Sequence, residues 1–373
     1  MKNIFIIFIL LVIAACSPKP KEAKNQKTKI PVYAWLGGPG ESSDEELKSL
    51  FEEYKLKGID VLMYNGGQNA EVYKRVGKIA KAAGLGFHTW IPTMVQGKKP
   101  QIDTSWYAIN GLGASAYDKP AYVDYYKFLC PSKAGTYSFL DSMYSNVAQV
   151  EEVDAIHLDY IRFPDVILAR GLWDKYGLVM DKEYPQFDYC YCDDCANGFK
   201  NKTGIDIKSV KDPSQVQEWK QYRYDLITGI VNRLSDKIHS HGKKINAAVF
   251  PGPHSVAKKI VRQEWDKWNL DMYFPMNYND FYLEGTKWVG EVTKEAVESV
   301  EKPVISGLFI CPNPEGKTEE NDPEYHGLIP SELGDAIRQS MVNGAAGICL
   351  FTPKRMTGEH WVEFEKAIYQ TYQ

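Results

Sequence analysis

The strongest constraint on the fold is an alternation between short apolar runs and longer segments whose apolar residues recur at helical spacing. Eight runs have the length and composition of buried strands, at residues 32–36, 59–64, 87–91, 154–165, 244–250, 270–276, 304–310 and 347–351. Helices are expected at residues 43–54, 70–83, 134–147, 216–239 and 359–372. This alternation is typical of βα units around a parallel sheet. Eight units in about 340 residues predict an α/β fold, a (β/α)8 TIM barrel.

Two connections in the predicted barrel are long. They span residues 92–132, after the third strand, and residues 165–214, after the fourth. Loops of that length in a compact domain are usually functional. The alternative fold, an open doubly wound sheet, would need a glycine-rich phosphate turn after the first strand. Residues 37–40 miss the G-x-G-x-x-G spacing, and Pro39 lacks a backbone donor.

The N-terminal segment has the features of an export signal. Residues 1–15 combine a short positive start, an apolar stretch and small residues before Cys16. The apolar stretch is too short for a comfortable membrane span. Residues 13–16 resemble the lipobox of bacterial lipoproteins, which implies cleavage before Cys16 and its lipidation; a plain secretory signal is the alternative. Residues 16–29 are then a flexible tether, and residues 30–373 a barrel in the cell envelope.

Charge and composition limit the partners. A formal net charge of -4 over 373 residues argues against nucleic acid or an anionic membrane surface, since both favour a basic stripe. The 24 tyrosines and 9 tryptophans suit a sugar-binding cleft, although such rings also fill ordinary cores. A carbohydrate is therefore the expected partner, and the membrane is reached through the lipid on Cys16.

Ionisable side chains gather where the fourth predicted strand ends. An apolar run begins at Ala155 and is stopped by Pro164, so Asp159 and Arg162 fall at or just past the carboxyl end of the strand. In α/β barrels the loops at that end build the active site, whereas the opposite face is mostly structural. This stretch is therefore the first place to look for chemistry.

Three motifs, taken together, resemble the glycosyl hydrolase-like family 10 barrels and their relatives. They are Phe-His-Thr-Trp at residues 87–90, His-Leu-Asp-Tyr-Ile-Arg-Phe-Pro at residues 157–164 and Phe-Pro-Met-Asn-Tyr at residues 274–278. Further matches bring the resemblance to the whole of residues 30–373. It implies a glycosidase-like barrel. Related sequences often carry two adjacent acids after the His-x-Asp start, whereas Tyr160 follows Asp159 here.

Glycoside cleavage needs two carboxyl groups flanking the scissile bond. Asp159 is the first candidate, expected to stay ionised as nucleophile or charge stabiliser while Arg162 or His157 lowers its pKa. The alternative is that Asp159 only pairs with Arg162 to hold a loop. Asp280, just after the sixth strand, is the candidate partner, with a plain turn residue as the alternative. Other acids compete for this second role: Asp103, Asp118, Asp124, Glu315, Glu319, Glu320 and Glu324.

Polar and aromatic side chains at the same strand ends are candidate sugar contacts. A pyranose site needs a ring beneath the apolar face of the sugar and amides or hydroxyls at its edge. The predicted substrate-binding residues are His88, Trp90, His157, Arg162, Trp35, Asn65, Asn277 and Tyr278. For His88 a hydrogen-bonded core position is an equal alternative. Trp106, Tyr107 and Trp173 lie in the long loops and are either cleft walls or loop staples.

Cys190, Cys192 and Cys195 form a C-x-C-x-x-C run in the second long loop. Thiolates at this spacing suit a structural zinc ion, with Cys130, a neighbouring acid or a histidine as fourth ligand. Outside the cytoplasm a disulfide, between Cys192 and Cys195 or between Cys130 and one of the three, is the competing interpretation, and free thiols are the remaining one. No cofactor is required for the expected reaction. Cys349, in the eighth strand, is expected in the core.

The leading hypothesis is a lipid-anchored, extracytoplasmic glycoside hydrolase that cleaves a poly- or oligosaccharide with two carboxylates. The alternative is a non-catalytic surface glycan-binding lipoprotein on the same barrel. Two carboxylates across the cleft at roughly 5 to 10 Å would favour the enzyme. A metal hydrolase using His88, His157 and His254 is a third hypothesis, without H-x-x-x-H spacing to support it.

Overall fold

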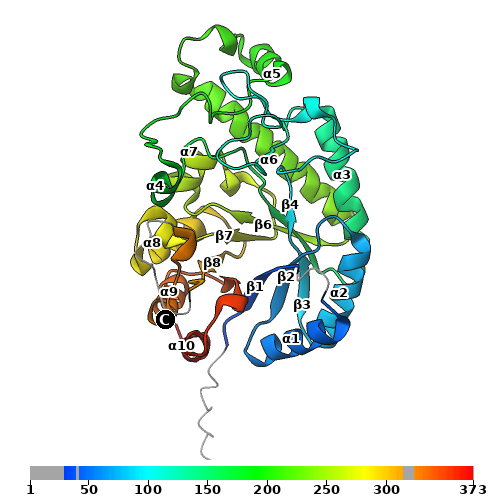
Figure 1. Ribbon diagram of the computed structural model, residues 1–373, viewed down its shortest axis with the longest axis vertical. Coiled ribbons are helices and arrows are strands. Elements are labelled where there is room, and N and C mark those ends of the chain that lie inside the picture. Colours follow the sequence, from blue (N-terminus) through cyan, green and yellow to red (C-terminus); the bar gives the residue numbers. More distant parts are fainter. Residues whose placement is uncertain (1–28, 39–41, 314–322, 373) are drawn as a thin grey trace, which may run out of the picture.

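The computed structural model describes residues 29–38, 42–313 and 323–372, which fold as a nearly closed barrel of eight parallel strands (Figure 1). The predicted α/β barrel is confirmed. Its strands are β1 (Val32–Gly37), β2 (Val61–Asn65), β3 (Gly86–Thr89), β4 (Ile91–Pro92), β5 (Ala155–Asp159), β6 (Lys244–Val249), β7 (Met272–Pro275), β8 (Ile305–Phe309) and β9 (Gly347–Phe351). β3 and β4 are two pieces of one barrel strand, interrupted at Trp90.

The strand order closes the sheet on itself. Neighbours pair in the order β7-β6-β5-β3-β2-β1-β9-β8, and β4 also pairs with β5. Parallel bridges from Tyr273 to Val304 and from Met276 to Gly307 join β7 to β8. Because all the strands run in the same direction, their carboxyl ends meet at one rim, where barrel enzymes carry their active sites.

Helices surround the barrel, and shorter ones, α4 and α5 among them, lie in its long loops (Figure 1). They are α1 (Asp44–Leu56), α2 (Ala70–Ala82), α3 (Ala134–Ala148), α4 (Trp173–Tyr176), α5 (Asp193–Thr203), α6 (Gln217–Ser240), α7 (Lys258–Val261), α8 (Thr286–Ser299), α9 (Pro330–Val342) and α10 (Gly358–Ile368). Ser43 caps α1 and forms a capping box with Glu46, which fixes where this helix begins. The predicted helices match within two residues at each end, except that α10 ends at Ile368. Among the described residues, no helix is long and apolar enough to cross a membrane.

Two apolar layers result. The larger lies between the strands and the outer helices, and the smaller fills the inside of the barrel. Trp35, Met63 and Phe274 belong to the inner layer, and so does Cys349, in the predicted core position. A Cβ at Gly307 would lie 2.9 Å from the Trp35 ring, so glycine at this position of β8 makes room for the indole.

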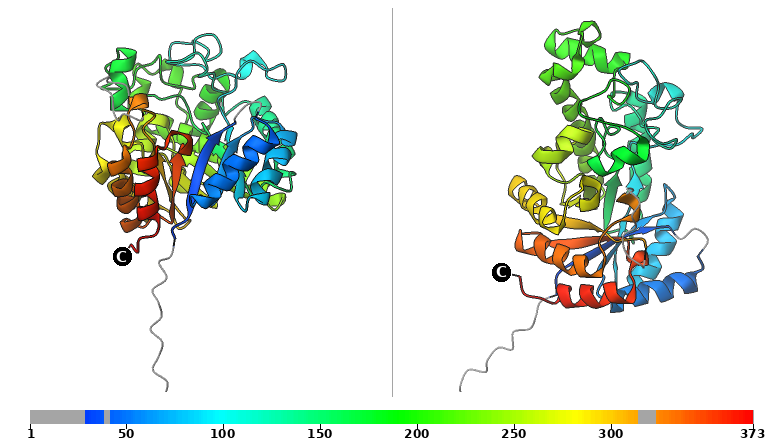
Figure 2. Two further views of the ribbon diagram at one scale, coloured as in Figure 1. Left: turned by 60° about the horizontal axis from the view of Figure 1, so that its bottom comes forward. Right: turned by 60° about the vertical axis from the view of Figure 1, so that its left-hand side comes forward.

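The two long loops are present and pack against each other. Residues 93–133 join β4 to α3, and residues 160–216 join β5 to α6. An antiparallel bridge pairs Asn110 with Tyr189, and the Tyr191 N–H donates to the Ile109 carbonyl oxygen at 2.7 Å. Figure 2 shows these segments, coloured cyan to green, gathered at one end of the barrel away from the C-terminus. The predicted signal (1–15), Cys16 and nearly all of the tether (16–29) lie outside the described residues.

Candidate functional site

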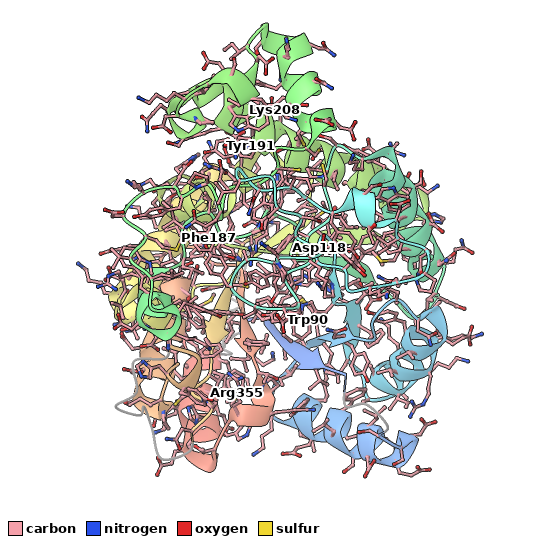
Figure 3. All side chains as sticks on the ribbon, turned by 45° about the horizontal axis from the view of Figure 1, so that its top comes forward. Trp90, Asp118, Phe187, Tyr191, Lys208 and Arg355 are labelled. Carbon is pink, nitrogen blue, oxygen red and sulfur yellow. The ribbon has the colours of Figure 1, made fainter. Side chains whose placement is uncertain are left out.

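A cavity of about 610 Å³ lies at the carboxyl rim, bounded by the two long loops. Trp35 from β1, Trp90 and Asp159 reach it from the barrel strands. Figure 3 places Trp90 near the centre of the strands and Arg355 on the segment after β9. The remaining polar or aromatic lining residues are Tyr122, Tyr125, Tyr126, Tyr160, Arg162, Asp165, Tyr176, Phe250, Tyr278, Phe281, Tyr282, Phe309, Tyr325 and Phe351.

Asp159 is the last residue of β5, and its carboxyl group is buried at the cavity with 9% of the residue exposed. Its Oδ2 accepts a hydrogen bond from Trp90 Nε1 at 2.8 Å, and its Oδ1 accepts one from the Tyr160 N–H at 2.7 Å. Tyr160 has a φ of 47°, a left-handed conformation that is costly for a bulky residue and is enriched at functional sites.

The protonation of Asp159 differs from the expectation. Burial raises its pKa, and the hydrogen bond from Trp90, the one from the Tyr160 N–H and the charge of Arg162 only partly oppose this effect. A lowered pKa was expected from a charged neighbour. The desolvation of the carboxylate outweighs that charge because Arg162 is directed elsewhere.

Arg162 pairs with Asp165. Its Nη1 donates to Asp165 Oδ2 at 2.8 Å and to the Phe163 carbonyl oxygen at 2.9 Å, and both charged side chains are buried. The guanidinium lies 5.0 to 5.6 Å from the ring centroids of Tyr126, Phe128, Tyr160 and Phe250. Asp165 is therefore the residue that forms the loop-holding ion pair with Arg162. Asp159, the partner considered from the sequence, does not form it.

His88 and His157, predicted as substrate contacts, lie inside the barrel. Trp35 Nε1 donates to His157 Nε2 at 2.9 Å, so His157 Nδ1 carries the proton and donates to Asn246 Oδ1 at 2.5 Å. Asn246 Nδ2 is 3.4 Å from His88 Nδ1. Burial lowers the pKa of His88 to about 4 and that of His157 to about 3, so both rings are neutral at pH 7. The structure thus gives them core positions, and His157 orients Trp35 from within.

Three other predicted site residues lie away from the cavity. Asp280 accepts the Gly327 N–H on its Oδ2 at 2.8 Å, and it is not among the described residues that line the cavity. Asn277 is buried and donates to Thr293 of α8 and Ser306 of β8, because alternate residues of an extended chain face opposite sides and this one faces the helices. Asn65 lines a separate cavity near the start of α2.

Aromatic rings from the last barrel strands complete the site. Tyr278, a predicted contact, stacks on Phe351 with ring centroids 5.9 Å apart and planes at 15°. Trp90 meets the same Phe351 edge-on at 5.9 Å. Arg355 lies 4.9 Å from the ring centroid of Phe309. These faces and edges match what a sugar ring requires.

Sequence reasoning missed Arg355 and the tyrosines of the first long loop. Tyr122, Tyr125 and Tyr126 all line the cavity. A signal was available, because three tyrosines in five residues of a long loop after a barrel strand are unusual. Arg355 follows the eighth strand closely, and the same argument from strand ends would have included it.

The three loop aromatics considered as cleft walls or loop staples do not line the cavity and instead hold the long loops in place. Tyr107 is buried and donates from its hydroxyl to the Gln96 carbonyl oxygen at 3.1 Å. Trp173 Nε1 donates to the Leu168 carbonyl oxygen at 2.9 Å. The Trp106 ring packs on α3 so tightly that a Cβ at Gly135 would clash with it.

The competing acids do not add a described carboxylate to the cavity. Asp103 accepts the Ser105 N–H at 2.8 Å, and Asp118 and Asp124 are exposed on the first long loop. Glu315, Glu319 and Glu320 and the side chain of Glu324 lie outside the described residues. Among the described residues, the carboxylates that line the cavity are Asp159 and Asp165.

Comparison with known proteins shows the fold. No protein-family model and no curated protein sequence matches the chain. Among solved structures, the PgaB (BpsB) glycoside hydrolase domain from Bordetella bronchiseptica has a TM-score of 0.65 at 10% identity, covering 91% of this chain and 98% of that domain. The β-amylase catalytic domain from Paenibacillus polymyxa has 0.61 at 12% identity, covering 91% and 97%. A class V chitinase from Pseudomonas fluorescens has 0.53 at 10%, covering 91% and 99%.

The chain shares its barrel architecture with these glycoside hydrolase domains. Membership of glycosyl hydrolase-like family 10 stays a prediction, since the similar structures share only the architecture at such low identity. The histidines of the metal-hydrolase hypothesis are not gathered: in the described part of the chain, the group of His, Cys, Asp and Glu side chains close enough to hold a metal ion is a set of four cysteines.

Proposed function

We propose that this protein is a glycoside hydrolase that cleaves a poly- or oligosaccharide. The observation that carries the proposal is Asp159: a buried carboxyl group with a raised pKa, at the end of a barrel strand, in a cavity lined by aromatic rings. A carboxyl group whose pKa is raised above its ordinary value holds its proton to higher pH, and a proton donor of this kind is what protonation of a glycosidic oxygen requires. Similarity in fold to glycoside hydrolase domains supports the same conclusion.

In this proposal Asp159 is the general acid and Asp165 the second carboxylate. Asp159 donates its proton to the departing oxygen, and Asp165, salt-bridged to Arg162, faces the same cavity as nucleophile or as base for water. Asp280, the partner expected from the sequence, does not line the cavity and enters only as a comparison in the experiment below. Trp35, Trp90 and the rings around Tyr278 support the sugar.

We further propose that the protein works in the cell envelope, attached through a lipid on Cys16. The support is the sequence of residues 1–16 alone. Cys16→Ala should move the protein from the membrane fraction to the soluble fraction and abolish labelling by radioactive fatty acid. Labelling that persists in this variant would contradict the anchor.

A non-catalytic glycan-binding role is the second candidate. The ion pair between Asp165 and Arg162 favours this role. Asp159 and Asp165 are the described carboxylates that line the cavity, and the ion pair already engages Asp165, so Asp159 has no unpaired carboxylate partner among them. Such a protein would keep the aromatic cavity and bind glycans without cleaving them.

The deciding experiment compares the wild-type protein with Asp159→Asn, Asp165→Asn and Asp280→Asn on a panel of glycans, following reducing ends and affinity together. Cleavage by the wild type, lost in Asp159→Asn with binding retained, supports the enzyme. Loss in Asp165→Asn, with Asp280→Asn active, supports Asp165 as the partner. Binding without cleavage by the wild type on every glycan supports the binding protein.

Trp90→Phe is expected to move the alkaline limb of the kcat/KM pH profile to higher pH. The indole N–H stabilises the ionised form of Asp159, so its removal raises the pKa of this group further. A general acid then keeps its proton to higher pH. The profile on one cleavable glycan measures the shift.

Trp173→Phe is the matched control, because it also loses an indole hydrogen bond but leaves Asp159 untouched. Its alkaline limb should stay in place. An unmoved limb in Trp90→Phe, or a shift to lower pH, would argue against Asp159 as the proton donor.

A further inference from the structure

Four buried cysteines from the two long loops converge on one point. Cys130 comes from the end of the first loop, and Cys190, Cys192 and Cys195 come from the second. Their Sγ atoms all lie within 4.8 Å of one another, and none of the four forms a disulfide. Segments about sixty residues apart along the chain thus bring four soft ligand atoms into one small volume.

The sulfur positions fit one shared centre better than two disulfide bonds. Cys130 Sγ lies 3.4 Å from Cys192 Sγ and 3.5 Å from Cys195 Sγ, so it is not matched to one partner. Four sulfurs, each about 2.3 Å from a tetrahedral zinc ion, lie about 3.8 Å apart. Two disulfides would instead divide the atoms into bonded pairs at about 2.05 Å.

Hydrogen-bond donors surround the sulfurs as they do in metal–thiolate sites. The Ile109 N–H donates to Cys190 Sγ at 3.2 Å, and Ser132 Oγ lies 3.1 Å from Cys195 Sγ. Cys192 occupies the N-cap position of the eleven-residue helix α5, and Cys195 lies in its first turn, where backbone N–H groups favour negative charge. Such contacts orient and stabilise thiolate ligands.

We propose that Cys130, Cys190, Cys192 and Cys195 bind one structural zinc ion. Each cysteine that binds releases its thiol proton to solvent, and no electron is transferred. Four thiolates fill the tetrahedral coordination of zinc and leave no open position for substrate, so the ion has no catalytic role. Soft thiolate ligands in a tetrahedral set favour zinc over the hard divalent cations.

The ion would tie together the two walls of the cavity. Tyr122 and Tyr126 lie on the loop that contains Cys130, whereas Arg162 and Asp165 lie on the loop that contains the other three cysteines. Cross-linking these loops holds the walls at a fixed separation. This inference does not rest on glycan cleavage, because zinc content can be measured whether or not the protein is an enzyme.

The test uses the full chain, produced with its leader and purified without chelators. Elemental analysis by mass spectrometry should find about one zinc per chain, and peptide mapping without reduction should find all four cysteines as free thiols. Cys130→Ser should retain less than about a tenth of the zinc. Stripping the wild type with a strong chelator should lower Tm by on the order of 10 °C, and added zinc should restore it.

Cys349→Ala is the matched control, since this buried thiol lies in β9 outside the cluster, and its zinc content should equal that of the wild type. Disulfide-linked peptides among the four cysteines, iron in place of zinc, or a wild-type protein without bound metal would each overturn the proposal. If Cys130→Ser fails to fold, the zinc content and peptide map of the wild type decide the question by themselves.

Discussion

Asp159→Asn is expected to lower kcat for glycan cleavage by about 10²- to 10⁴-fold while leaving glycan affinity nearly unchanged. The amide has the size of the carboxyl group, and its oxygen can still accept the hydrogen bond from Trp90 or from the Tyr160 N–H. It has no carboxyl proton to give to the leaving oxygen. Initial rates on the best glycan of the panel, together with calorimetric affinities, measure the effect.

The same substitution should leave the protein as stable as the wild type at pH 7, or more stable. Because burial raises the pKa of Asp159, the folded state binds this proton more tightly than the unfolded chain does. The free energy of unfolding therefore falls as pH rises from the ordinary value of 3.8 toward the raised pKa, and the buried carboxylate costs stability above it. Asparagine removes that cost.

Asp118→Asn, on the exposed part of the first long loop, is the matched control and should change neither rate nor Tm (Figure 3). A fall in Tm of Asp159→Asn that parallels its loss of rate would indicate that Asp159 only maintains the fold. Full activity of this variant would contradict its role as the general acid.

Asp188→Asn is expected to lower the free energy of unfolding by about 3 to 5 kcal/mol, the usual cost of breaking a buried ion pair from one side. Asp188 Oδ1 accepts hydrogen bonds from Arg223 and, at 3.2 Å, from Arg262, and all three side chains are almost fully buried. In the variant, two buried guanidinium groups would no longer have this carboxylate as a charged partner. Chemical denaturation of both proteins gives the difference.

The pH dependence of the free energy of unfolding should report the same interaction of Asp188 with the two arginines. Burial by itself would raise the pKa of Asp188, but Arg223 and Arg262 outweigh it and hold the pKa below the ordinary value of 3.8. The contribution of Asp188 is therefore complete above about pH 4 and is lost as pH falls through the lowered pKa. The stability difference between wild type and Asp188→Asn should shrink in acid.

Asp225→Asn is the control for this prediction. Its carboxylate pairs with Lys202 at 2.8 Å, but the side chains of Lys202 and Asp225 are 58% and 41% exposed, so water screens the pair and its removal should cost less than about 1 kcal/mol. Equal losses in the two variants would mean that burial of the Asp188 network contributes nothing beyond a surface ion pair.

Much of the fold could be predicted because its determinants are local. Apolar runs of strand length, helical spacing between them and the stop at Pro164 all act over a few residues, and they placed Asp159 at the end of β5 before any packing was known. The same reasoning located both long loops. It reached Trp35, Trp90 and Tyr278 at the cavity, because strand ends of a parallel barrel share one rim.

Which side chains pair with each other could be learned only from the tertiary structure. Asp159 and Asp165 are each three residues from Arg162, so sequence distance treats them alike. The left-handed turn at Tyr160 and the rings packed on the guanidinium direct Arg162 to Asp165 and leave Asp159 at the cavity. The sequence by itself determined the barrel and the acid at the end of its fourth strand. Tertiary packing decided how deeply each site residue is buried and which side chains it contacts. It also brought Cys130 to the three distant cysteines. Both depend on contacts between segments far apart in the sequence, which no local pattern encodes.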